Sequence, residues 1–206
     1  MKRSFAISDW FYRLSITVRR NRFAVLIYAL MCLVFLIIGI AIGINVSDKA
    51  EYVLSNSAAI FRFLRGDNGI VSFFFLDLFM TAVYCLFAAS MFFYKALAYI
   101  SLAPCLYKSY VLGMNTSIII VVYSASSLPM LFVLFVPICI IEIFILCLIS
   151  ARCFKFASLN RGCMPSKIDI AEYYRGLLQY LFIIVILTLI KAVTLVLFGS
   201  ALIGVI

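Results

Sequence analysis

The chain has 206 residues and a net charge of +9, and 67% of its residues are hydrophobic while only 12% are charged. Soluble domains average about 45–50% apolar and about 25% charged residues. A small globular protein cannot bury so much apolar surface, because a large share of its residues must face solvent. The composition excludes a soluble enzyme, a disordered chain and a coiled coil. It predicts an all-α polytopic integral membrane protein that forms a single membrane domain over residues 1–206.

The residue types exclude several kinds of chemistry. Histidine is absent, which removes His-dependent triads, imidazole zinc ligands and imidazole proton relays. The seven cysteines lie mostly within apolar runs and never at C-x-x-C spacing, so they are interpreted as small buried hydrophobes. We therefore expect no catalytic residue, no metal and no cofactor. In a membrane chain the positive charge indicates basic cytoplasmic segments, and no nucleic-acid partner is expected.

A spanning helix needs about 20 mostly apolar residues, and five segments meet that requirement. They run approximately over residues 23–44, 69–93, 109–127, 128–150 and 177–206. The first is too long for a cleavable signal peptide and no small-residue cleavage site follows it, so it is expected to remain as an anchor. Pro104 within 94–108 predicts a turn with a short interfacial piece. The last segment is long enough to be tilted, or broken near Gly199.

The distribution of lysine and arginine predicts the orientation. Basic residues concentrate in segments 1–22, 94–108 and 151–176, whereas 45–68 carries mixed charges. Because basic loops stay in the cytoplasm, the amino terminus is expected inside and the carboxyl terminus outside. The loop 45–68 is then external and the loop 151–176 cytoplasmic. Five spans agree with this alternation, and the expected location is the cell membrane.

Two flanking segments show amphipathic patterns. Residues 4–20 mix aromatic and aliphatic side chains with arginines, which is typical of a basic helix lying on anionic lipid headgroups. Residues 47–65 place apolar side chains at helical spacing. This second pattern fits either a surface helix that covers the bundle or a docking surface for an extracytoplasmic partner.

Three ionisable residues interrupt the apolar spans, where such residues are costly and usually face protein, water or an opposite charge. By the helical rise, Asp77 lies roughly 12 Å and Lys191 roughly 10 Å from the outer side, whereas Glu142 lies about 20 Å from it. The matched depths predict an ion pair between Asp77 and Lys191. Glu142 is left with three alternatives: a polar crevice, a protonated neighbour, or the ammonium group of Lys108.

Proline and glycine add two further expectations. Pro137 lies about one and a half turns before Glu142 and is expected to bend the fourth span. Gly39 and Gly43 form a G-x-x-x-G step that permits a close helix approach. That step fits internal packing or dimerisation equally, so a homo-oligomer stays open.

Several local patterns resemble the stage II sporulation protein M family of spore-forming bacteria. They are Arg-Asn-Arg at 20–22 before Ile-Gly-Ile-Ala-Ile-Gly at 38–43, the segment Leu-Tyr-Lys-Ser-Tyr-Val-Leu-Gly at 106–113, and Pro-Ile-Cys-Ile-Ile-Glu at 137–142. Gly113, Pro137 and Glu142 keep the family's residues. The chain differs where the family has Asn-Gly at 108–109 and His-Gly at 138–139, and Lys191 stands where an acid is common.

The resemblance implies a non-enzymatic membrane scaffold. Members of the family anchor and localise two cell-wall hydrolases, the stage II sporulation proteins D and P, during engulfment of the forespore. It implies docking faces in the external segment 47–68 and the short outer loop 124–129. The alternative is a membrane transport or permease subunit, which would work beside a separate ATPase. An intramembrane enzyme would need at least two convergent catalytic groups, and the sequence offers only isolated ones.

Overall fold

The structure, a computed structural model, describes residues 22–46, 70–93, 95–123, 135–159 and 167–203, and every element in these ranges is helical. The elements are α2 (Arg22–Val46), α5 (Ile70–Ser90), α6 (Lys95–Ile100), α7 (Ala103–Tyr123), α9 (Val136–Leu159) and α10 (Lys167–Ile203). The predicted all-α class is therefore confirmed. The predicted amphipathic segments 4–20 and 47–65 and the outer loop 124–129 lie outside the described residues.

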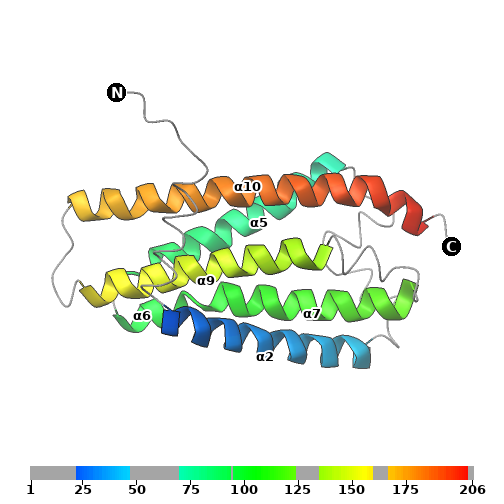
Figure 1. Cartoon of the computed structure of the whole chain (residues 1–206), viewed down its shortest axis with the longest axis horizontal. Coiled ribbons are helices and arrows are strands. Elements are labelled where there is room, and N and C mark those ends of the chain that lie inside the picture. Colours follow the sequence, from blue (N-terminus) through cyan, green and yellow to red (C-terminus); the bar gives the residue numbers. More distant parts are fainter. Residues whose placement is uncertain (1–21, 47–69, 94, 124–134, 160–166, 204–206) are drawn as a thin grey trace.

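The long helices form one elongated bundle (Figure 1). Helices α2 and α10 lie on opposite faces, α7 and α9 lie between them, and α5 crosses obliquely against α10. Helix α9 supplies much of the core, where Leu146, Leu148 and Ile149 are almost completely buried. Because α9 contacts α2, α5, α7 and α10, it forms the centre around which the other helices pack.

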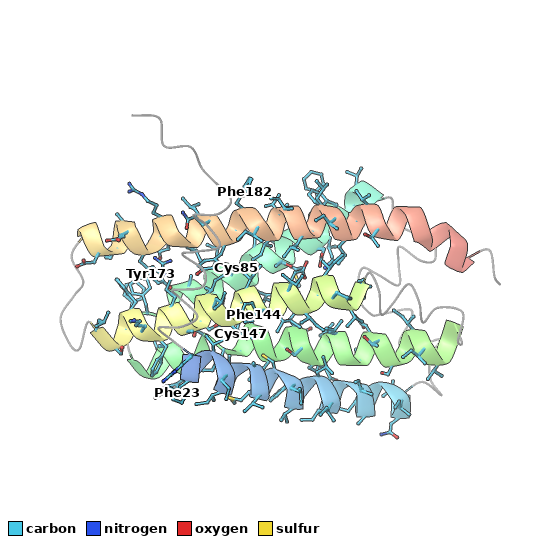
Figure 2. The ribbon with its side chains drawn as sticks, in the orientation of Figure 1. Phe23, Cys85, Phe144, Cys147, Tyr173 and Phe182 are labelled. Carbon is cyan, nitrogen blue, oxygen red and sulfur yellow. The ribbon has the colours of Figure 1, made fainter. Side chains whose placement is uncertain are left out.

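The outer faces of the bundle are strongly apolar. Phe23 on α2 is 71% exposed and Phe182 on α10 is 67% exposed (Figure 2). Exposed apolar patches of this kind are rare on soluble monomers. Among the described residues, three helical stretches are long and apolar enough to cross a bilayer: Arg22–Val46, Val136–Leu159 and Asp169–Thr194. A fourth apolar stretch, Phe74–Ser90, is shorter, and the chain's composition and these helices together support association with a membrane.

Helix α7 begins earlier than the sequence suggested. It begins at Ala103, and Pro104 occupies its first turn, where the missing backbone N–H removes no helical hydrogen bond. Proline therefore starts a helix here and does not prolong the turn. The assignment of Lys108 to a cytoplasmic connection is wrong, because this residue lies inside α7.

Helix α9 begins at Val136, about two turns after the predicted start of the fourth span. Pro137 is consequently in the first turn of α9, a position that proline tolerates. Because residues 124–134 lie outside the described part of the chain, the bend of the fourth span at Pro137 stays a prediction. The late start also changes the depth of every residue on α9, including Glu142.

The predicted cytoplasmic loop 151–176 is largely helical. Helix α9 continues to Leu159 and α10 already begins at Lys167. With 37 residues, α10 is the longest helix, and it runs through Gly199 without a break. At about 1.5 Å per residue it is roughly 55 Å long, well beyond the ~30 Å of a bilayer core. Helix α10 is therefore longer than a single bilayer crossing requires, and its apolar stretch covers Asp169–Thr194.

A glycine seam joins α2 to α7. A Cβ atom on Gly39 would come within 3.0 Å of the backbone N of Met114, and one on Gly43 would lie 2.8 Å from the Met114 carbonyl oxygen. In the other direction, a Cβ on Gly113 of α7 would come within 3.0 Å of the backbone N of Ile40. Reciprocal glycines let the two backbones approach closely. The G-x-x-x-G step thus serves internal packing in this structure.

Candidate functional site: a buried ion network

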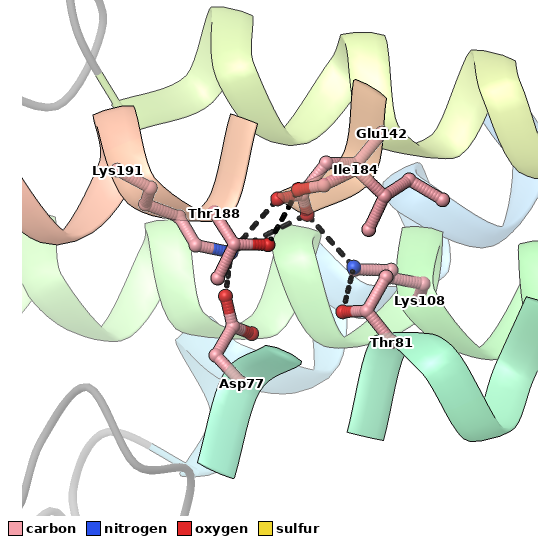
Figure 3. Close-up of polar contacts among 7 residues, drawn as sticks. All are labelled: Asp77, Thr81, Lys108, Glu142, Ile184, Thr188 and Lys191. Carbon is pink, nitrogen blue, oxygen red and sulfur yellow. Dashed lines mark hydrogen bonds and ion pairs between the residues drawn. The ribbon is translucent and has the colours of Figure 1, made fainter. Parts of the chain in front are cut away.

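Four ionisable side chains from four different helices meet inside the bundle (Figure 3). They are Asp77 of α5, Lys108 of α7, Glu142 of α9 and Lys191 of α10, and we call them the ion network. Lys191 Nζ lies 2.5 Å from Asp77 Oδ2 and 3.2 Å from Glu142 Oε1. Lys108 Nζ lies 2.7 Å from Glu142 Oε2. Glu142 and Lys191 each contact two opposite charges, so the contacts form one continuous chain.

Two threonines accompany the charges. Lys108 Nζ donates a hydrogen bond of 2.9 Å to Thr81 Oγ1. Thr81 follows Asp77 by four residues, so both face the interior from the same side of α5. Thr188 is fully buried beside the network, and its hydroxyl donates to the Ile184 carbonyl at 2.8 Å (Figure 3). The contact to Thr81 closes a ring of polar contacts that passes through α5, α10, α9 and α7.

The network is buried and electrically balanced. The side chain of Glu142 is 0% exposed and that of Lys191 4%, while those of Lys108 and Asp77 are 13% and 20% exposed. Two carboxylates and two ammonium groups cancel. Burial of a charge is tolerated when it is paired and hydrogen-bonded, and removing one partner leaves a costly uncompensated charge. The network is therefore suited to holding four helices in a fixed arrangement.

The predicted pair of Asp77 and Lys191 is confirmed as a direct contact. Of the three alternatives for Glu142, the contact with Lys108 is the one observed. The predicted separation in depth between Glu142 and Lys191 is wrong. Measured from the start of α9 at Val136, Glu142 lies about 9 Å along the helix, close to the ~10 Å of Asp77 from the start of α5.

Sequence reasoning missed Thr81 and placed Lys108 in the wrong element. A usable signal was present, since Pro104 four residues before Lys108 is a typical first-turn residue of a helix. Starting α7 there would have carried Lys108 into the apolar zone. The other singled-out residues do not join the ion network: Gly113 belongs to the glycine seam, and Pro137 lies in the first turn of α9.

The cysteines form a separate feature of the core. Six cysteines in the described ranges are free and buried, which confirms their interpretation as small buried hydrophobes. Cys32 Sγ of α2 lies 3.6 Å from Cys147 Sγ of α9. Cys105 Sγ lies 3.5 Å from the hydroxyl oxygen of Ser150. Within the residues that the structure describes, no group of three His, Cys, Asp or Glu side chains is arranged to hold a metal ion.

Comparison with protein-family models, with characterised proteins and with solved structures finds no match for this chain.

Proposed function

We propose that the chain is a five-span protein of the cell membrane and acts as a non-enzymatic scaffold that anchors cell-wall hydrolases. The observation that carries the proposal is the ion network. It binds four helices together with all charges compensated and with its central carboxylate sealed from solvent. Such a core supports a rigid framework whose outer segments are free to hold other proteins.

The directions of the helices support five spans. Helices α2, α7 and α10 run one way along the bundle, and α5 and α9 run the opposite way (Figure 1). This alternation along the chain is what successive crossings of a bilayer require. The start of α2 and the end of α10 consequently lie at opposite ends of the bundle. With basic residues kept inside, the amino terminus is cytoplasmic and the carboxyl terminus external.

The contacts of the Glu142 carboxylate favour a scaffold over a permease subunit. Ionisable residues that conduct or couple ions face a pathway that water or substrate can enter. Both carboxylate oxygens of Glu142 are already engaged, Oε1 with Lys191 and Oε2 with Lys108. A substrate ion would have to displace a lysine to reach this group.

The proteins that the scaffold would anchor are inferred from the resemblance to the stage II sporulation protein M family. They are the hydrolases named stage II sporulation proteins D and P, which act outside the membrane during engulfment. The proposed docking segment is the external segment 47–68. The basic segment 1–22 would hold the chain to anionic lipids on the cytoplasmic side.

Reporter fusions test the placement in the membrane. Alkaline phosphatase fused after Ile206 is expected to be active, since it would be exported, and a fluorescent protein at the amino terminus is expected to fold in the cytosol. The orientation would be contradicted if the phosphatase after Ile206 is inactive and a fluorescent protein fused at the same position folds in the cytosol. It would also remove the wall-facing role.

Co-purification tests the scaffold itself. The full chain and both hydrolases are expressed together, with residues 45–68 scrambled in one variant and residues 160–166 scrambled in a matched control. We expect the first variant to lose the hydrolases and the second to retain them. Equal retention by both variants would exclude the loop 45–68, and retention of neither hydrolase by the unaltered chain would refute the scaffold.

A further inference from the structure

One partly buried cation of the bundle, Arg152, lies outside the ion network. Arg152 lies on α9, and no carboxylate in the described residues pairs with it. This contrasts with the ion network, in which each lysine contacts a carboxylate. A guanidinium group stays charged in proteins and has five N–H donors. A half-buried guanidinium with no carboxylate partner among the described residues has donors that suit an anion.

The guanidinium of Arg152 lies between α9 and α10 against Tyr173 and Gly176, and we call this position the seat. Its Cζ is 5.8 Å from the centre of the Tyr173 ring, a cation–π distance. On α10 it rests against Gly176, where a Cβ atom would overlap the guanidinium nitrogens. Glycine is thus needed at 176 to leave room for the Arg152 head group in its observed place.

Tyr173 is itself fixed, so the seat is rigid. Its side chain is 3% exposed, and its hydroxyl donates a hydrogen bond of 2.9 Å to the Ala89 carbonyl of α5. The ring stacks on Phe156 with 4.7 Å between centroids and contacts Phe92 at 5.2 Å. Figure 2 shows Tyr173 between α10 and α9. A rigid aromatic wall orients the planar guanidinium without consuming its hydrogen-bond donors.

The position of Arg152 along α9 suggests the source of the anion. It lies seven residues before the end of α9 at Leu159, about 10 Å along the helix. In the proposed orientation this end is cytoplasmic, so Arg152 lies near the level of the lipid headgroups. The cytoplasmic leaflet is the one that carries anionic lipids.

We propose that Arg152, seated on Tyr173 and Gly176, binds the phosphate group of an anionic phospholipid at the junction of α9 and α10. The planar fork of the guanidinium matches phosphate oxygens two at a time. The site is distinct from the ion network. It rests on the proposed cytoplasmic placement of this end of the bundle, but not on the hydrolases as clients.

Three variants separate the seat from general positive charge. Arg152→Gln removes the charge and keeps much of the side-chain length. Gly176→Ala retains Arg152 but displaces its guanidinium; it is expected to fold, because only the flexible end of a side chain has to move and alanine is a better helix former than glycine. Arg175→Gln is the matched control, since it removes one exposed charge from the same region of α10.

The assay is retention of lipid by the full-length protein. Protein is released from bilayers of equal phosphatidylglycerol and phosphatidylcholine, and the bound lipids are counted by native mass spectrometry. Unaltered protein is expected to be enriched in phosphatidylglycerol. Enrichment is expected to fall about ten-fold in Arg152→Gln, because the charge-assisted hydrogen bonds from the guanidinium to the phosphate are lost. It is expected to fall in Gly176→Ala as well and to stay close to the original in Arg175→Gln.

Three outcomes would overturn the proposal. They are equal enrichment in unaltered protein and Arg152→Gln, a loss in Arg175→Gln as large as in Arg152→Gln, and loss of the enrichment in millimolar inorganic phosphate, which would assign the site to a soluble anion. The basic segment 1–22 is identical in all variants, so it cannot produce a difference between them. If the reporter fusions support the orientation and the lipid assay fails, only the lipid site is refuted.

Discussion

Lys191 is the position where a single change should most disturb the bundle. Its ammonium group is shared by Asp77 and Glu142, so Lys191→Met leaves two carboxylates opposite the one remaining lysine of the network. Breaking a buried ion pair from one side costs about 3–5 kcal/mol, because the other charge stays buried without compensation. We expect a loss of that size in the free energy of unfolding.

The double variant Asp77→Asn with Lys191→Met should recover much of this loss. It removes one charge of each sign and leaves the contact between Lys108 and Glu142 intact at 2.7 Å. Replacing a buried pair by neutral side chains is often close to neutral in stability. The single variant Asp77→Asn should be milder than Lys191→Met, since Lys191 would still contact Glu142. A coupling energy of about 1–3 kcal/mol between the two positions is expected.

The measurement is reversible unfolding in bicelles, with the four proteins of the cycle compared under one condition. Ile190→Met is the matched control, because its side chain is exposed on the same turn of α10 and should change stability by less than about 0.5 kcal/mol. If the double variant is as unstable as the sum of the two single variants, the two residues do not interact. The role of the ion network in holding the helices would then be refuted.

Three further outcomes follow from the packing of the bundle. Gly113→Val should lower the free energy of unfolding by about 1–3 kcal/mol, because the glycine seam has no room for a side chain, and the same unfolding assay measures it. Mild oxidation with copper phenanthroline should cross-link Cys32 to Cys147, detected as a disulfide-linked peptide by mass spectrometry, since their sulfur atoms are 3.6 Å apart. Tyr173→Phe should cost about 1 kcal/mol by removing the hydrogen bond to the Ala89 carbonyl, again measured by unfolding.

Neighbouring residues provide controls for these three outcomes. Ile37→Val changes an exposed side chain of α2 and should leave stability almost unchanged. Cys32→Ser should abolish the cross-link, and Cys85→Ser, on α5, should not. Tyr174→Phe changes a more exposed hydroxyl next to Tyr173 and should cost little. A stable Gly113→Val protein, a cross-link that survives Cys32→Ser, or equal effects of the two tyrosine variants would contradict the packing described.

The sequence by itself determined the class of the protein and part of its site. A composition of 67% hydrophobic residues and long uncharged runs predicts apolar helices. The free energy of moving an apolar side chain out of water depends mainly on its own apolar area, so it can be read from the sequence. The same local reasoning identified Asp77 and Lys191 as costly exceptions that need each other. It also identified Gly39 and Gly43 as a place of close helix contact.

Only the tertiary structure decided the register of one helix against another. Pro104 and Pro137 are compatible with a turn, a bend or a helix start, and local preference does not distinguish these outcomes. In the structure Pro104 lies in the first turn of α7, and Lys108 and Glu142 meet Lys191 in one ion network. Register depends on contacts between residues far apart in the chain, so a depth counted from one end of an apolar run cannot specify it.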